Sequence, residues 1–498
     1  MPLKLPGLYY DKQRRRYFKV ENSSTAPRDA AWSSDNVKKR KIQDAEAAAA
    51  LRRMTLHKNR IARSRVLEEP LMGGFFAREC GDAPADLVAA SFAQGLVGMG
   101  KLPLADARWH SDTNIKHMFV AGKDEKTGIC TAYATLDELT LLSTYVPRDP
   151  ATGRVHRRLI SNYVRPASHV APYRELAVPQ ISDIKYHERS NRILVTSRAP
   201  SSEVSMWAFV PKTTGPNDPR PSWLIGRNGV TLYLNIKGSG DPTYNDYAAN
   251  TVCPAPVGSP NICMVGTSRG LTHVDSSGNM RWTSPWGPGK YFCHPEAFRD
   301  VFAVEFQRSH RDLILFGGRP GALFVADLRT HPSVWDHLDL PAPITHVRSL
   351  ANDHQVLVAG LRDTLRVLDL RFAGRQCINR GTPHVTAPAQ PLFAIDGYRN
   401  AAQINIGLDY DPESGVAAAA HDDGTVKLYS VRNGGSGGGS GSRRLANRDL
   451  DRVRSRHGAI HCIQFQRFPG DATPTLFVGE HSNINAYSFG VDDPEDEA

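Results

Sequence analysis

Two stretches with the same pattern follow one another in this chain of 498 residues: LILFGGRPGALFVADLR at 313–329 and VLVAGLRDTLRVLDLR at 356–371. In each stretch an apolar run ends at small residues, a turn with Gly or Asp follows, and a second apolar run ends in Asp-Leu-Arg. This is the pattern of a β-hairpin. The two copies lie about forty residues apart, which is one common repeat length for a blade of a β-propeller.

The hairpin pattern recurs along most of the chain. Five further copies are HMFVAGKDEKTGICTAYATL (117–136), RILVTSRAPSSEVSMWAFV (192–210), ICMVGTSRGLTHVDSSG (262–278), GVAAAAHDDGTVKLYSV (415–431) and TLFVGEHSNINAYSFG (475–490). Four units are preceded by another short apolar run: DVFAVEF (300–306), ITHVRSL (344–350), INIGLDY (404–410) and IHCIQFQ (460–466). Four-stranded units of this kind bury both faces only against neighbours, so they close into a ring. The sequence predicts an all-β, seven-bladed propeller over residues 86–490.

The last blade needs a strand from the N-terminal side, because its hairpin nearly reaches the C-terminus. Either VLEEPLMGGFFAREC (66–80) or LVGMGKLPLADARW (96–109) could supply it. The segment NGGSGGGSGSRR has the composition of a flexible linker, and we predict a mobile loop at 433–442 between blades six and seven. The acidic tail, 491–498, is expected to be disordered.

The positive charge of the chain is concentrated at its N-terminus. Residues 1–70 hold 17 Lys and Arg against 8 Asp and Glu, whereas the rest of the chain holds 44 against 43. We therefore expect a basic extension over 1–85, partly helical or disordered, with a helix near 37–66. It contains a candidate nuclear-import or nucleic-acid patch, formed by Lys38, Lys39, Arg40 and Lys41.

Composition argues against several classes of protein. No run of eighteen apolar residues occurs, so no membrane span is expected, and a nuclear or cytoplasmic location is favoured. The seven cysteines are dispersed without a paired spacing, which indicates reduced thiols and no metal site. GTSRG (266–270) matches a hydrolase elbow around Ser268, but a strand follows where a helix is required. His421 and His481 occupy ordinary turn positions. We expect no cofactor and no enzymatic activity.

The two Asp-Leu-Arg copies are the candidate docking site. Asp327, Arg329, Asp369 and Arg371 fall where a strand ends, on successive blades, so both pairs should lie on one rim of the ring. A local role is also open, in which Asp fixes the turn and Arg caps it. Arg is enriched at the centre of protein interfaces, which favours docking for a repeated pair.

The chain resembles the WD-repeat substrate receptors of cullin-4 RING ubiquitin ligases. Their shared mark is a W-D-x-R box at the end of the third strand of a blade, and here the boxes read ADLR (326–329) and LDLR (368–371), with Asp and Arg retained and Trp absent. The closest resemblance is to the factor-4 branch of these receptors. It rests on LPGLYYDKQRRRYFKV (5–20), on the two opening stretches and on AAAAHDDGTVKLYSV (417–431), and it covers the first twenty residues and most of 300–490.

The resemblance implies a non-catalytic receptor whose box arginines dock on the damaged-DNA-binding adaptor of the cullin-4 ligase. Another surface would hold a protein substrate that the sequence does not name. In such receptors a helix before the first blade often adds to the adaptor contact, and the helix near 37–66 is the candidate. The alternative function is a nuclear WD-repeat scaffold in an RNA or chromatin complex, with the basic extension contacting nucleic acid.

Overall fold

The structure is a computed structural model of the chain. It describes residues 7–11, 14–22, 24–27, 30–60, 87–104, 114–121, 129–147, 155, 160–161, 173–178, 180–198, 205–211, 225–235, 248–283, 300–331, 335–371, 376–377, 390–432, 444–468 and 471–489. The chain divides into two compact units, Met1–Gly73 and Gly74–Ala498.

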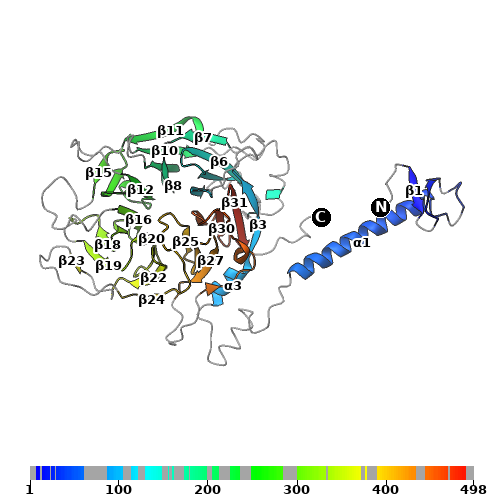
Figure 1. Cartoon of the computed structure of the whole chain (residues 1–498). Coiled ribbons are helices and arrows are strands. Elements are labelled where there is room, and N and C mark those ends of the chain that lie inside the picture. The colour runs from blue at the N-terminus through cyan, green and yellow to red at the C-terminus, as the bar shows by residue number, and fades with distance from the viewer. Residues whose placement is uncertain are drawn as a thin grey trace, which may run out of the picture. The chain divides into compact units, whose positions relative to one another are not determined.

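The described strands of the second unit form seven antiparallel sheets around a centre, with β8, β16 and β20 innermost and β7, β11 and β15 outermost (Figure 1). Blade one contains β4 (His117–Ala121), β5 (Ile129–Thr135), β6 (Thr140–Pro147) and β7 (Tyr173–Ala177). Blade two contains β8 (Ile181–His187), β9 (Arg192–Ser197), β10 (Ser205–Pro211) and β11 (Ile225–Asn235). Blade three contains β12 (Ala249–Pro254), β13 (Asn261–Thr267), β14 (Gly270–Asp275) and β15 (Met280–Trp282).

The remaining blades repeat this order. Blade four contains β16 (Asp300–Phe306), β17 (Leu313–Arg319), β18 (Ala322–Asp327), β19 (Asp336–Asp339) and the added β23 (Gln376–Cys377). Blade five contains β20 (Ile344–Ser349), β21 (Gln355–Gly360), β22 (Thr364–Asp369) and β24 (Phe393–Ala394). Blade six contains β25 (Leu408–Asp411), β26 (Val416–Ala420), β27 (Val426–Ser430) and β28 (Arg444–Leu445). Blade seven contains β29 (Ile463–Gln466), β30 (Thr475–Glu480), β31 (Asn483–Phe489) and β3 (Leu96–Pro103).

The predicted seven-bladed propeller is confirmed by this topology. The segment 117–136 forms a hairpin, as predicted. It provides the first and second strands of blade one, whereas the other predicted hairpins are second and third strands. One detail of the prediction is wrong. The segment 433–442, itself outside the described residues, is flanked by β27 and β28 of one sheet, so it joins two strands of blade six and does not join blades six and seven.

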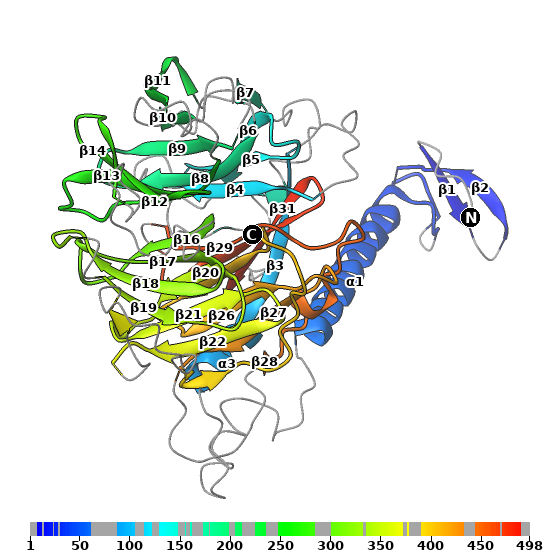
Figure 2. The ribbon, with the colours of Figure 1, turned by 60° about the vertical axis from the view of Figure 1, so that its left-hand side comes forward.

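The ring is closed by β3, which pairs antiparallel with β31 from Leu96–Phe489 to Pro103–Asn483. Figure 2 shows the two strands side by side. Of the two candidate segments, 96–109 therefore contains the closing strand, and 66–80 lies outside the described residues. The helix α3 (Leu87–Gly95) leads directly into β3. The Asn447 side-chain amide donates to the Leu96 carbonyl at 2.9 Å, which fixes this junction against blade six.

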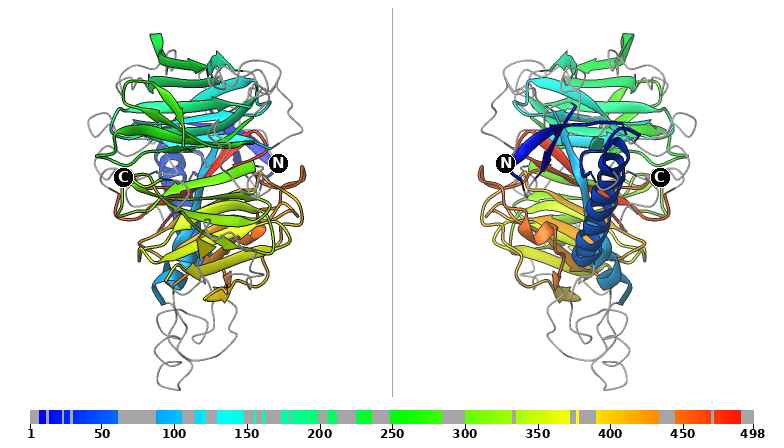
Figure 3. Two further views of the ribbon diagram at one scale, coloured as in Figure 1. Left: turned by 90° about the vertical axis from the view of Figure 1, so that its left-hand side faces the viewer. Right: turned by 90° about the vertical axis from the view of Figure 1, so that its right-hand side faces the viewer.

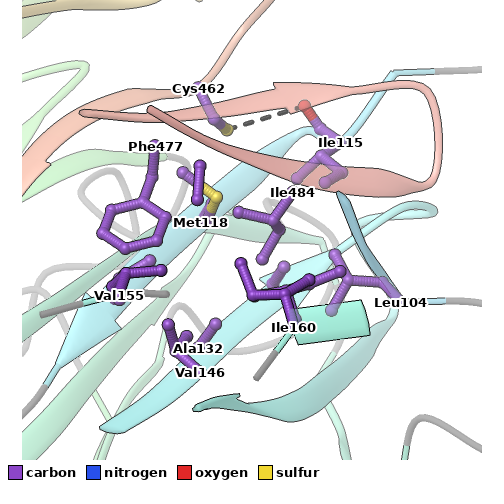
Figure 4. Packing of buried hydrophobic residues seen from close by; sticks show 14 of the residues in the cluster. Leu104, Ile115, Met118, Ala132, Val146, Val155, Ile160, Cys462, Phe477 and Ile484 are labelled. Carbon is purple, nitrogen blue, oxygen red and sulfur yellow. Dashed lines mark hydrogen bonds between the residues drawn. The ribbon is translucent and has the colours of Figure 1, made fainter. Parts of the chain in front are cut away.

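Apolar side chains fill the spaces between neighbouring blades. Figure 4 shows the cluster where blade seven meets blade one. There Leu102 of β3, Phe477 of β30 and Ile484 of β31 are fully buried. Alternate residues of each strand point to opposite faces of a sheet, so each blade contributes side chains to the apolar clusters on both of its sides. Seen edge-on in Figure 3, the strands of the blades run between the two faces of the ring.

The first unit contains a hairpin and a long helix. Strands β1 (Leu8–Asp11) and β2 (Arg16–Lys19) pair antiparallel, and α1 spans Ser34–Arg60. The predicted helix near 37–66 overlaps α1, and its last residues lie outside the described ones. Among the described helices, none is long and apolar enough to cross a membrane.

Candidate docking surface

The two predicted boxes end equivalent strands of consecutive blades. Asp327 is the last residue of β18, the third strand of blade four, and Asp369 is the last residue of β22, the third strand of blade five. The C-terminal ends of corresponding strands in neighbouring blades open on the same side of the ring. We call this side the box face.

Both boxes have the same internal geometry. The backbone N–H of Arg329 donates to Asp327 Oδ1 at 2.9 Å, and its guanidinium donates to both carboxylate oxygens, at 2.9 and 2.7 Å. In blade five, Arg371 makes the same three bonds to Asp369, at 3.0, 3.1 and 2.8 Å. The local role left open by the sequence is therefore present in both copies, because each Asp holds the turn and orients its own Arg.

This pairing changes the charge of the rim. The hydrogen bond from each guanidinium holds the pKa of its Asp below the usual value and raises the pKa of the Arg, so each pair is a neutral ion pair at physiological pH. The arginine side chains stay on the surface, 69% exposed for Arg329 and 52% for Arg371. The rim thus presents two oriented guanidinium groups with little net charge.

A pocket of about 400 Å³ lies between the two boxes. Asp327 lines it from blade four and Leu370, within the second box, lines it from blade five. Its other lining residues are Gln307, His310, Leu313, Val325, Thr330, Trp335, Asp336, Asp353 and His354. The structure therefore places the two boxes on one shared surface.

A tryptophan supports the first box from outside the motif. The indole N–H of Trp335, just before β19, donates to the Asp327 carbonyl at 3.2 Å. Its ring is 2% exposed and packs edge-on against Phe316, with centroids 5.9 Å apart. A Trp eight residues after the Asp thus fixes the end of β18, although the box itself lacks one.

The basic patch lies in the first unit. Lys38, Lys39, Arg40 and Lys41 are all exposed on α1. The Arg40 guanidinium lies over the Tyr9 ring at 5.5 Å from its centroid and donates to the Tyr9 hydroxyl. The patch and the aromatic N-terminal signature, which the sequence presented separately, are thus in direct contact.

The central channel holds the larger pocket, of about 540 Å³, lined by innermost strands of all seven blades. Its charged side chains are largely used to join blades. Arg348 of β20 contacts Glu305 of blade four at 3.1 Å and Asp409 of blade six at 3.3 Å. These two carboxylates raise the Arg348 pKa against the opposing effect of burial.

Four blades use a side-chain acceptor to hold the backbone of the next blade. Asp183 accepts the Val252 N–H at 3.1 Å, and Glu305 accepts the Ser349 N–H at 2.9 Å. Asp409 accepts the Phe465 N–H at 2.7 Å. Gln464 accepts the Val120 N–H at 2.8 Å and donates to the Val120 carbonyl at 3.0 Å. Because these polar groups are engaged between blades, we assign them a structural role.

The remaining candidates have structural environments. Ser268 lies in the turn between β13 and β14, where its hydroxyl accepts the Ala248 N–H at 2.9 Å. His421 is 4% exposed and shares a 2.8 Å hydrogen bond with the Tyr429 hydroxyl, while burial lowers its pKa to about 4. His481 is a turn residue with φ of 53°. Among the described cysteines, Cys253, Cys263 and Cys462 are free thiols.

No group of three His, Cys, Asp or Glu able to hold a metal ion occurs within the part of the chain that the structure describes. Sequence reasoning missed Trp335 and the four acceptors between blades. The signal for the acceptors was available, because ISDIKYH (181–187), DVFAVEF, INIGLDY and IHCIQFQ each carry Asp, Glu or Gln inside an apolar first strand.

Comparison with known proteins does not identify a family for this chain. No family model matches the chain. No curated protein matches it. Among solved structures, the chain is similar to the crystal structure of the WD40 beta propeller domain of Doa1, at 9% identity and a TM-score of 0.43, over 79% of this chain and 97% of that chain. This similarity carries no argument about function, and the propeller assignment rests on the sheet topology.

Proposed function

We propose that this chain is a non-catalytic propeller interaction protein that docks through its box face on the damaged-DNA-binding adaptor of a cullin-4 RING ubiquitin ligase. In this function another surface recruits a protein substrate for ubiquitination. The observation that carries the proposal is the repetition of one Asp–Arg geometry on consecutive blades, beside a shared pocket.

The geometry supports docking because the two arginines are oriented before a partner arrives. A guanidinium held by its own Asp loses little further side-chain entropy on binding, and its remaining N–H edge can donate to carbonyl or carboxylate oxygens. Because each pair is neutral, it is better suited to a partner that offers oriented hydrogen-bond acceptors than to a partner with a dense negative charge.

The pocket between the boxes supports the same function. It is lined by Trp335, Leu313 and Leu370 as well as by polar groups, which suits insertion of a partner side chain at the centre of an interface. The residues that carry most of the binding free energy at protein interfaces are commonly arranged in this way, with arginines beside a pocket.

Binding of the purified full chain to the purified adaptor tests the proposal. The double variant Arg329→Asp/Arg371→Asp should bind roughly 30-fold more weakly or not at all, because two central contacts are lost. Arg329→Lys/Arg371→Lys should also bind more weakly, since Lys keeps the charge but cannot make the bidentate bond to Asp.

A matched control is Arg269→Asp/Arg362→Asp, which makes the same charge change in turns after the second strands of blades three and five, away from the box face. It should bind as the unchanged chain does. All variants should first show an unaltered melting temperature. Equal binding by the box and control variants would refute the docking function.

The location of the protein belongs to the same proposal. We propose that Lys38, Lys39, Arg40 and Lys41 act as an import signal, so that the receptor acts in the nucleus as well as the cytoplasm. Replacing the four by Gln in a fluorescently tagged chain should lower the nuclear fraction, and an unchanged distribution would remove the signal.

A further inference from the structure

The hairpin β1–β2 has two unlike faces. Tyr9 pairs with Phe18 across the strands, whereas Tyr10 pairs with Tyr17, and alternate residues point to opposite sides. The Tyr9–Phe18 face is covered, because Phe18 stacks on Trp32 with centroids 4.5 Å apart and Tyr9 contacts Arg40 of α1.

The opposite face carries Leu8, Tyr10, Tyr17 and Lys19. Its two tyrosine rings lie 4.9 Å apart, and Leu8 and Tyr17 are 40% and 38% exposed. An exposed aromatic pair on a two-stranded ribbon is a surface on which a planar group can stack. We call the side chains of Tyr10, Tyr17 and Lys19 the tyrosine face.

Positive charge lies on both sides of the hairpin within this unit. Lys19 on the tyrosine face and Arg15 in the turn are exposed. Arg16 alternates onto the covered face, and Arg14 lies over the Trp32 ring at 5.8 Å from its centroid. The covered face is joined through Arg40 to the exposed run of basic residues on α1. Single-stranded nucleic acids are bound by this combination of stacking rings and cations that follow the phosphates.

We propose that the tyrosine face binds single-stranded nucleic acid, with a base stacked on Tyr17 and phosphates bound by Lys19 and Arg15. A duplex hides the faces of its bases, and an acidic protein offers charge without planar rings, so neither uses the aromatic pair. This site goes beyond adaptor docking and uses no residue of the box face.

Fluorescence anisotropy of the full chain with a labelled oligouridine of about 20 nucleotides tests the proposal. The chain should bind it at low ionic strength, more tightly than a duplex of the same length. Tyr17→Thr keeps a residue that favours strands but removes the ring, and it should weaken binding about tenfold. Tyr17→Trp keeps an aromatic ring without the hydroxyl, and it should bind as the unchanged chain does. If Tyr17 acted only through its hydroxyl, this variant would also bind more weakly.

Leu8→Thr is the matched control, since Leu8 is about as exposed on the same side of the hairpin but has no ring and lies outside the tyrosine face. It should leave binding unchanged. Arg15→Asn/Lys19→Gln should flatten the dependence of binding on salt, because fewer phosphates are neutralised; Asn also tolerates the positive φ of 51° at Arg15.

Three results would overturn the site. The first is that the Tyr17→Thr variant binds oligouridine as tightly as the unchanged chain does. The second is that the chain binds the duplex as tightly as oligouridine. The third is that polyglutamate displaces oligouridine at equal charge concentration. The last result would identify an acidic protein as the partner. Loss of this site would leave adaptor binding intact, so the two proposals fail independently.

Discussion

The Arg371 guanidinium donates to both carboxylate oxygens of Asp369, and the Arg371 backbone N–H donates to the same carboxylate. The Asp369 side chain therefore fixes both the turn and the direction of the guanidinium. Arg329 and Asp327 repeat the arrangement one blade earlier. The boxes are therefore preformed donor groups whose charge is balanced before any partner binds.

Removing the carboxylates separates orientation from charge. Asp327→Asn/Asp369→Asn makes the box face more positive but leaves each arginine without its bidentate partner. We expect weaker adaptor binding, measured by calorimetry, because the guanidinium groups must then be ordered on binding. Tighter binding by this variant would mean that net charge, and not orientation, attracts the adaptor.

The box pairs should resist mild acid. Their Asp pKa values are lowered by the hydrogen bonds from the arginines, so the ion pairs persist above the folded-state pKa and are lost only as the pH falls through it. Adaptor binding at constant ionic strength should therefore stay level from pH 8 to about pH 5. A midpoint within that range would show that a group other than the two Asp–Arg pairs controls adaptor binding.

The fold itself should lose stability at higher pH than the pH at which the Asp–Arg pairs break. Burial lowers the pKa of His117 and of His421 to about 4, whereas both titrate near 6.5 when unfolded. As the pH falls from about 6.5 to 4 the unfolded chain therefore takes up protons that the folded chain does not, and stability decreases. For His421, which is nearly inaccessible, this loss is of the order of 1–3 kcal/mol.

Thermal unfolding as a function of pH measures this effect. His421→Gln can keep a hydrogen bond to Tyr429 but does not titrate, so its melting temperature should vary less between pH 6.5 and 4. A variant curve parallel to that of the unchanged chain would show that His421 does not contribute to acid lability.

Closure of the ring depends on the packing of β3. Leu102→Ala removes a fully buried side chain between blades seven and one and should lower the free energy of unfolding by about 2–5 kcal/mol. Leu139→Ala is the control, because that side chain is 52% exposed, and its effect should stay within about 0.5 kcal/mol. Similar melting temperatures for the two variants would contradict the assigned closure.

The ion pairs across the channel should be coupled. Arg348→Met leaves Glu305 and Asp409 close together without their cation, and we expect a loss of about 1–3 kcal/mol in urea unfolding. Adding Glu305→Gln/Asp409→Asn removes the repulsion while the amide oxygens can still accept the Ser349 and Phe465 N–H groups. This triple variant should be more stable than Arg348→Met alone; if it is less stable, the carboxylate charges are not the source of the loss.

Much of the fold was predictable because blades repeat. Apolar runs with turn residues at a regular spacing predict strands, and the late last hairpin predicts a closing strand from the N-terminal side. The choice of 96–109 over 66–80 was not predictable, since both are apolar and only packing against β31 distinguishes them. The place of 117–136 as the first two strands of its blade was also not predictable, because three successive apolar runs look alike.

The candidate site was predictable only in part. The sequence indicated that Asp327, Arg329, Asp369 and Arg371 share a rim, but the two roles weighed as alternatives are both compatible with the geometry found, because an Asp that fixes the turn also orients its Arg. The contribution of Trp335 was hidden, since it lies outside the motif and reaches Asp327 through the backbone carbonyl. The contact of Arg40 with Tyr9 joins two motifs that are far apart in sequence.

The pairing of β3 with β31 also sets the order in which this chain can be completed during synthesis. Strand β3 leaves the ribosome before the strands of blades one to six, and its partner β31 follows all of them. At a synthesis rate of about 5–20 residues per second, β3 waits for tens of seconds with its edge unpaired. An unpaired apolar edge is a site for association with other chains, so the newly made protein should depend on chaperones until β31 emerges.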